Sequence, residues 1–129
     1  IKSFNDIIGK KIGAKKGTMQ EQIIQQYQKG YGQIVDIPTT WMSVSRTMTG
    51  QTDGALGDLG VMQYYAKQYG SQYGIEVVRD PKAVKEQLAF AVKLGNTELQ
   101  SKLNSGLAKI KADGNYERIY RKWFGDQHK

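Results

Sequence analysis

The stretch GAKKGTMQEQII, Gly13–Ile24, decides how this chain begins to fold. A short apolar run over residues 11–16 ends in two lysines, and the chain then turns at a glycine. Met19, Ile23 and Tyr27 follow at four-residue spacing, which predicts a helix with one buried face. A strand that leads directly into a helix is typical of the first half of a parallel β–α–β unit.

The same rhythm continues along the chain. Apolar runs at 34–37 and 53–56 predict two further strands, and those at 75–78 and 88–92 predict two more. Helical spacing occurs between them in Trp41–Met48, with Thr39 or Thr40 as its cap, and in Val61–Tyr69, which we expect to end at Gly70. The predicted fold class is α/β, a three-layer sandwich with a mainly parallel sheet of about five strands.

The end of the chain departs from this rhythm. Asn96 is a suitable helix N-cap, and an apolar stripe follows it at helical spacing. Asp113–Gly114 interrupts the helix, and a second apolar cluster begins after it. The stripe contains Leu99, Leu103, Leu107 and Ile110, and the cluster contains Tyr116, Ile119, Tyr120, Trp123 and Phe124. We therefore expect a C-terminal arm of two helices.

Composition limits the classes of function. The 129 residues suffice for one domain with a hydrophobic core, and the formal net charge is +7. This charge permits contact with nucleic acid, but the basic residues are spread and the aromatic residues fall on apolar stripes, so a solvated surface is favoured and no nucleic acid is expected. No apolar run is long enough to span a membrane. The lack of cysteine fits a reducing cytosol or a bacterial extracytoplasmic protein.

The sequence favours binding over catalysis. Its single histidine, His128, lies two residues from the end, where a nucleophile–base pair cannot be held in place. Cysteine is absent and histidine nearly so, and therefore no metal-binding cluster or cofactor is expected. The chain has neither GxGxxG nor GxxxxGK[ST].

The first candidate site is the start of the helix after residue 18. Thr18 and Glu21 have the spacing of a capping box, and Gly17 allows the backbone to approach a ligand closely. Free amides and the positive end of the helix dipole favour an anion at such a position. The alternative is an ordinary helix cap beside a solvated lysine pair.

The second candidate is Asp58, which follows a predicted strand and precedes a predicted helix. Its ordinary role would be an N-cap, but its carboxylate would also stand at the carboxyl edge of the sheet, where ligands of parallel sheets bind. An ammonium group there would form a charge-assisted hydrogen bond. Together the two sites offer donors for a carboxylate and an acceptor for an ammonium, as a free α-amino acid requires.

Three segments carry a resemblance to a known family: KKIGAKKGTMQEQ, GQTDGALGD and LAFAVKLGNTELQSKLNSGLAKIKADGNYERIYRKWFG. In order and spacing they resemble the polar amino-acid solute-binding proteins of ABC importers. These proteins have the type II periplasmic-binding-protein fold, in which two α/β lobes close around an amino acid. The resemblance covers nearly the whole chain, but it matches only the second lobe and the returning tail of the family's proteins.

The resemblance implies a division into residues 1–94, the second lobe, and 95–129, the helices that pack on the first lobe in the family. The first lobe has no counterpart here, so we expect a fragment of a longer protein. It also implies an extracytoplasmic location, either the periplasm or a cell-surface lipoprotein. The implied partners are a polar amino acid such as glutamine or arginine, the permease subunits and the first lobe.

Site residues carry over by position. Thr18, Met19 and Gln20 match the turn that receives the ligand carboxylate, although Met19 stands where the family often has a threonine. Asp58 matches the acid that holds the α-ammonium. Lys15 matches a position that reaches the ligand in some glutamine-binding members. Asp53 matches an Asp-Ala pair of the family, here Asp-Gly, and we expect a structural role for it.

Without the first lobe, the apolar residues of the arm would lose their partner. Each buried large apolar side chain contributes roughly 1.5–3 kcal/mol. We therefore expect the arm to fold back on its own lobe or to exchange with a second copy in a domain-swapped homodimer.

The alternatives for function are an enzyme on the same fold, such as a dehydratase or a lobe of a cell-wall lytic enzyme, and a sensor domain.

Overall fold

A computed structural model describes residues 1–81, 83 and 87–125 of the chain. The chain forms two compact units, Ile1–Ala83 and Val84–Lys129, and each is described by itself. Among the described residues, no helix combines the length and the apolar character needed to cross a bilayer. The predicted division into a second lobe, 1–94, and C-terminal helices, 95–129, refers to a longer protein and stays a prediction.

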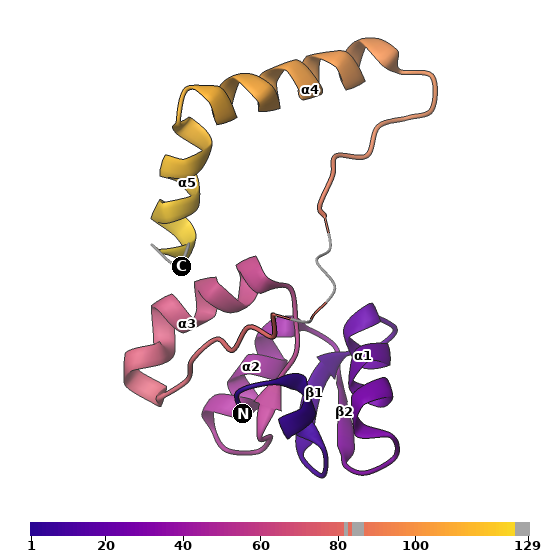
Figure 1. Cartoon of the computed structure of the whole chain (residues 1–129), viewed down its shortest axis with the longest axis vertical. Helices are drawn as coiled ribbons and strands as arrows, with labels where there is room; N and C mark the ends of the chain where they lie inside the picture. Colours follow the sequence, from indigo (N-terminus) through magenta and orange to yellow (C-terminus); the bar gives the residue numbers. More distant parts are fainter. Residues whose placement is uncertain (82, 84–86, 126–129) are drawn as a thin grey trace. The chain divides into compact units, whose positions relative to one another are not determined.

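The first unit is built on a parallel sheet (Figure 1). Its strands are β1 (Lys11–Lys15), β2 (Gln33–Ile37) and β3 (Gly54–Ala55), arranged in the order β2-β1-β3. Ile12 pairs with Ile34 of β2 and with Gly54 of β3. Since all three strands run in the same direction, their carboxyl ends lie at one edge of the sheet, as the alternation of strands and helices predicts.

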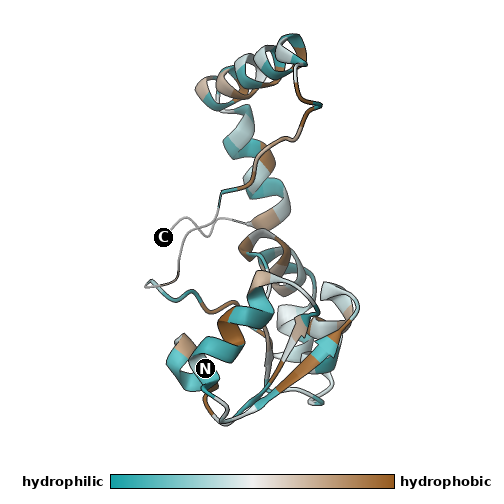
Figure 2. Ribbon diagram, turned by 90° about the vertical axis from the view of Figure 1, so that its right-hand side faces the viewer, coloured by the Kyte–Doolittle hydropathy of each residue, from teal (hydrophilic) through white to brown (hydrophobic). Residues whose placement is uncertain are grey.

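The prediction of about five strands is wrong for the part of the chain that the structure describes, where the sheet has three. Residues 75–80 and 87–93 belong to no helix or strand. Figure 2 shows that much of the stretch before α4 is hydrophobic, and Leu88 is 92% exposed. An apolar run indicates that a segment is able to pair, but a strand also needs a neighbour for its backbone hydrogen bonds.

The helices of the first unit lie where the sequence predicts them. They are α1 (Met19–Gln28), α2 (Thr40–Met48) and α3 (Leu59–Tyr73), preceded by the short 3-10 helix η1 (Phe4–Ile7). The α2 cap is Thr39, whose Oγ1 accepts a hydrogen bond from the Met42 amide at 3.2 Å. α3 continues past the predicted end at Gly70 to Tyr73, and its C-cap is Gly74, which has a φ of 65°.

The sheet is covered on both faces, which gives the predicted three layers. On one face, Ile12 and Ala14 of β1 are buried with Ile7 of η1 and Ile24 of α1. Neighbouring residues of a strand face opposite sides, so Gly13 faces the other layer, where α2 lies against β1. Figure 1 shows α1 on one side of the sheet and α2 and α3 on the other.

The aromatic residues of α3 pack on α2. The Trp41 ring lies 5.2 Å from the Tyr65 ring and 5.3 Å from the Tyr69 ring, measured between centroids. These contacts hold α3 on the α2 side of the sheet.

The second unit contains α4 (Thr97–Ala112) and α5 (Asn115–Phe124). Asn96 caps α4 as predicted, since its Oδ1 accepts a hydrogen bond from the Leu99 amide at 3.2 Å. Asp113–Gly114 separates the helices, also as predicted. Four apolar side chains of this unit are between 42% and 48% exposed, namely Leu99, Tyr116, Ile119 and Trp123.

Candidate functional site

The candidate site lies where β1 and β3 end side by side. β1 continues into α1 on one face of the sheet, whereas β3 continues into α3 on the face that α2 covers. The two loops therefore diverge to opposite faces. Ligands of open parallel sheets bind in the crevice outside such a divergence, which is the topological switch point.

The start of α1 differs from the predicted capping box. The Thr18 hydroxyl donates to the Lys15 carbonyl at 2.6 Å and does not cap the helix. The Glu21 carboxylate reaches one residue further than predicted, and its Oε2 accepts a hydrogen bond from the Gly17 amide at 2.8 Å. Gly17 has a φ of 72°, in the left-handed region, and this turn brings its amide toward Glu21.

This arrangement leaves the helix start open to a ligand. The first amides of an α-helix have no carbonyl partner within the helix, and the side chain of the N-cap residue Thr18 does not cap those of α1. The amides of Met19 and Gln20 belong to this turn. The helix end thus combines unpaired donors with the positive end of the dipole, which is the arrangement that binds a carboxylate.

Asp58 occupies the N-cap position of α3, as predicted, but its side chain does not cap the helix. Instead, Asp58 Oδ1 accepts a hydrogen bond from Gln20 Nε2 at 2.9 Å. This contact joins residues 38 positions apart and places the start of α1 beside the start of α3. The predicted common edge is therefore present, with donors on one loop and a carboxylate on the other.

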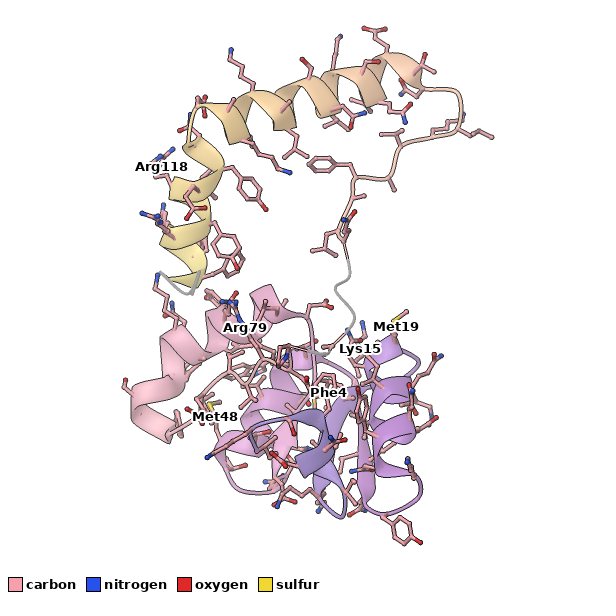
Figure 3. All side chains as sticks on the ribbon, viewed as in Figure 1. Phe4, Lys15, Met19, Met48, Arg79 and Arg118 are labelled. Carbon is pink, nitrogen blue, oxygen red and sulfur yellow. The ribbon has the colours of Figure 1, made fainter. Side chains whose placement is uncertain are left out.

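The remaining predicted site residues lie on the β1–α1 side. Lys15 is the last residue of β1 and is exposed, and Met19 is the first residue of α1 and is 55% exposed. Figure 3 labels both residues and shows them close together at this junction. Lys15, Thr18, Met19 and Gln20 are thus brought together with Asp58, and their roles in binding stay predictions.

Two other acidic residues have partners of their own. Asp53 Oδ2 accepts a hydrogen bond from the Lys11 amide at 2.7 Å, at the amino end of β1, so the structural role expected for Asp53 is confirmed. Asp36 lies 3.6 Å from the Lys16 ammonium in an exposed ion pair. In the described segments, no three His, Cys, Asp or Glu side chains are grouped to hold a metal ion, and His128 lies outside those segments.

Sequence reasoning missed the contact between Gln20 and Asp58. It assigned Gln20 to the turn that receives the carboxylate and gave its side chain no partner, whereas in the structure this side chain donates to the acid. No local pattern signals a contact across 38 residues. Only the strand order, with β3 beside β1, brings the two residues together.

The site is thus the switch point of a parallel α/β unit, with helix amides on one loop and a carboxylate on the other. The sequence profile of the bacterial extracellular solute-binding proteins, family 3, matches residues 6–126. The chain belongs to this family. The predicted resemblance and extracytoplasmic location are thereby confirmed at the level of the family.

Relatives with assigned names are amino-acid-binding proteins. The putative ABC transporter arginine-binding protein 2 of Escherichia coli is 34% identical over 125 residues, which are 95% of this chain and 50% of that protein. The amino-acid-binding protein AabA of Dichelobacter nodosus is 30% identical over 96% of this chain and 49% of its own length. The chain therefore spans about half the length of these relatives.

A solved structure of an amino-acid-binding protein is also similar to this chain. An ancestral arginine-binding protein bound to arginine superposes with a TM-score of 0.76 and 32% identity, over 97% of this chain and 55% of that chain. Together with the parallel sheet, this similarity confirms the periplasmic-binding-protein fold.

Proposed function

We propose that this chain is one lobe of an extracytoplasmic receptor that delivers a polar amino acid to an ABC permease. In this role the lobe binds the α-carboxylate of the ligand at the start of α1 and the α-ammonium at Asp58. The mechanism is closure of two lobes around the ligand, without covalent chemistry.

One observation carries the proposal: the hydrogen bond between Gln20 and Asp58 holds the two loops of opposite polarity together. An amino acid presents a carboxylate and an ammonium on the same carbon atom, so its binding site needs a donor and an acceptor only a few ångströms apart. Uncapped amides of α1 and the carboxylate of Asp58 supply this pair.

Neighbouring residues complement these groups. The exposed ammonium of Lys15 adds positive charge on the carboxylate side. Thr18 closes the turn through its bond to Lys15 and keeps the first amides of α1 free for the ligand. Met19 contributes its amide, and its exposed side chain provides an apolar wall.

We propose arginine, glutamine or a similar polar amino acid as the ligand. The names of relatives favour this class: they include arginine-binding and histidine-binding proteins, and an ancestral arginine-binding protein has been solved with glutamine. One lobe offers only half of the contacts, so its affinity alone is weak. A first lobe supplies the rest, and it also provides the surface that covers the apolar residues of α4 and α5.

Within the isolated chain, we propose that the α4–α5 arm folds back on its own lobe or exchanges with a second copy. An enzyme on the same fold is the weaker alternative. A neighbouring structure is described as a precursor of cyclohexadienyl dehydratase, but it is itself called an amino-acid-binding protein.

The test is a titration of the ¹⁵N-labelled chain with L-arginine, L-glutamine and L-histidine, followed by NMR. We expect shifts of the Met19 and Gln20 amides and of the Asp58 amide, with dissociation constants well above the micromolar range. Agmatine, which is arginine without the carboxylate, is the control and should leave the α1 amides unchanged. Shifts confined to other regions would contradict the site, and sub-micromolar affinity of a monomer would contradict the half-site.

A further inference from the structure

We infer that Gln20 is a positioning residue, which orients the carboxylate of Asp58 toward the ammonium group of the ligand. The inference rests on the proposed function, because it assigns Gln20 a task within that site. It concerns the side chain of Gln20 and adds to the role that the family resemblance implies for this turn, which is to receive the ligand carboxylate.

The geometry separates the two oxygens of Asp58. Oδ1 accepts the hydrogen bond from Gln20 Nε2 at 2.9 Å, whereas Oδ2 has no partner among the described residues. A carboxylate has no hydrogen to donate, so the Gln20 side chain must present its NH₂ group to Asp58. With Oδ1 occupied, Oδ2 is the oxygen left to bind a ligand.

The contact restricts a side chain that is otherwise loosely held. Asp58 is exposed and its carboxylate does not cap α3, so nothing else that the structure describes fixes its side-chain torsions. Gln20 is partly buried on the first turn of α1, next to the amides proposed to bind the carboxylate. Its side chain therefore sets the distance between the donor and acceptor halves of the site.

A neutral donor suits this task. Lysine or arginine at position 20 would neutralise Asp58 and compete with the ligand ammonium for it, and glutamate would repel it. An amide donates a hydrogen bond and leaves the charge of Asp58 intact. Glutamine thus orients the carboxylate without weakening its attraction for a cation.

The experiment compares the wild-type chain with Gln20→Met, which keeps the length of the side chain but removes the donor. The matched control is Gln22→Met, an exposed position on the same helix. Each protein is titrated by NMR with L-arginine and with Nα-acetyl-L-arginine, which lacks the ammonium charge. We expect Gln20→Met to weaken L-arginine binding about three- to tenfold, the effect of one hydrogen bond, and Gln22→Met to leave it unchanged.

The acetylated ligand separates positioning from a general structural effect. Gln20→Met should leave the weaker binding of Nα-acetyl-L-arginine unchanged. In an Asp58→Asn background, Gln20→Met should no longer affect the affinity for L-arginine. Equal loss for both ligands, or no loss for L-arginine, would overturn the role of Gln20 while wild-type binding upholds the proposed function. If the wild-type chain binds none of L-arginine, L-glutamine and L-histidine, the proposed function fails and this inference fails with it.

Discussion

Gly13 of β1 lies against Ser43 of α2. A Cβ built on it would lie 2.6 Å from Ser43 Oγ and 3.0 Å from Ile37 Cδ1, inside the buried layer between sheet and helix. The Ser43 hydroxyl is itself buried and has no hydrogen-bond partner in the part of the chain that the structure describes. The requirement for glycine here comes from packing, since its φ is not in the left-handed region.

We therefore predict that Gly13→Ala destabilises the chain by roughly 1–3 kcal/mol through overpacking. Ser43→Ala should be close to neutral, because it removes a buried hydroxyl that lacks a partner. The double variant should recover part of the stability lost in Gly13→Ala, since the nearest clash is gone. Urea unfolding of the four proteins measures this, and strictly additive effects would rule out the proposed contact.

Near the N-terminus of the chain, the fold changes the pKa of one carboxyl group, that of Asp6 in η1. Hydrogen bonds from the Lys2 and Ser3 amides, at 2.7 and 3.0 Å, lower the pKa of its carboxyl below the ordinary value of 3.8. The folded state therefore favours the ionised form. The resulting stabilisation of η1 is present above pH 3.8 and disappears as the pH falls through the lower, folded-state pKa.

We predict that the Asp6 carboxyl carbon titrates in NMR with a midpoint below 3.8. The Lys2 and Ser3 amide signals should shift with the same midpoint, because they donate to this carboxylate. In Asp6→Asn, the acid-dependent shift of these amides should vanish. A midpoint above 3.8 would show that the amides do not hold the ionised form.

At the scale of elements, the two helix starts at Thr18 and Thr39 use the same residue type differently. Thr39 accepts a hydrogen bond from the Met42 amide and caps α2. Thr18 occupies the same position at α1, but its hydroxyl points back to Lys15. A conventional cap stabilises α2, whereas the start of α1 is left available for a ligand.

This difference predicts unequal effects of the same substitution. Thr39→Ala should cost about 1 kcal/mol, which is typical for the loss of an N-cap. Thr18→Ala should cost less, because it removes only an exposed bond to a carbonyl. Thermal unfolding of both variants provides the comparison. A loss in Thr18→Ala as large as that in Thr39→Ala would show that Thr18 does cap α1 in solution.

Elements that depend on local interactions could be predicted from the sequence, whereas those that depend on distant partners could not. Local signals were sufficient for β1, for α1 and for the Asn96 cap of α4, because spacing and cap residues are read within one or two turns. The strands predicted at 75–78 and 88–92 were wrong because pairing depends on a neighbour that local sequence does not reveal. The shift of Glu21 from Thr18 to Gly17 depends on a left-handed turn that spacing alone does not fix.

The candidate site was predictable only in part. The order of strand and helix sufficed to place Lys15, Thr18 and Asp58 at one edge of the sheet. The partner of Gln20 was not predictable, because a hydrogen bond across 38 residues depends on the lateral order of the strands. The same holds for Gly13, whose close neighbour Ser43 lies on a later helix.

At the scale of the whole molecule, the apolar side of α5 requires a covering surface. Ile119 and Trp123 are 44% and 48% exposed. The chain spans about half the length of its relatives, and apolar side chains of this size rarely stay uncovered. Either the chain's own first unit or a second copy is expected to cover them in solution.

We predict that the arm of the 129-residue chain resists trypsin, which would cleave a mobile segment rich in lysine and arginine. Ile119→Gln should make the arm sensitive, because it removes an apolar contact, whereas the control Ser105→Gln on α4 should not. Light scattering then distinguishes a dimer from a compact monomer. A monomer whose arm is cleaved rapidly would contradict both packing on the first unit and exchange with a second copy.

The most direct test of the central claim is the effect of Asp58→Asn on the dissociation constant for L-arginine, measured by NMR titration. Asp36→Asn is the matched control, since it removes the same charge from an exposed acid that is not at the switch point. We predict that Asp58→Asn weakens binding by about tenfold or more, as the loss of a charge-assisted hydrogen bond implies, and that Asp36→Asn changes it little. Unchanged binding in Asp58→Asn, or equal weakening in both variants, would contradict the account.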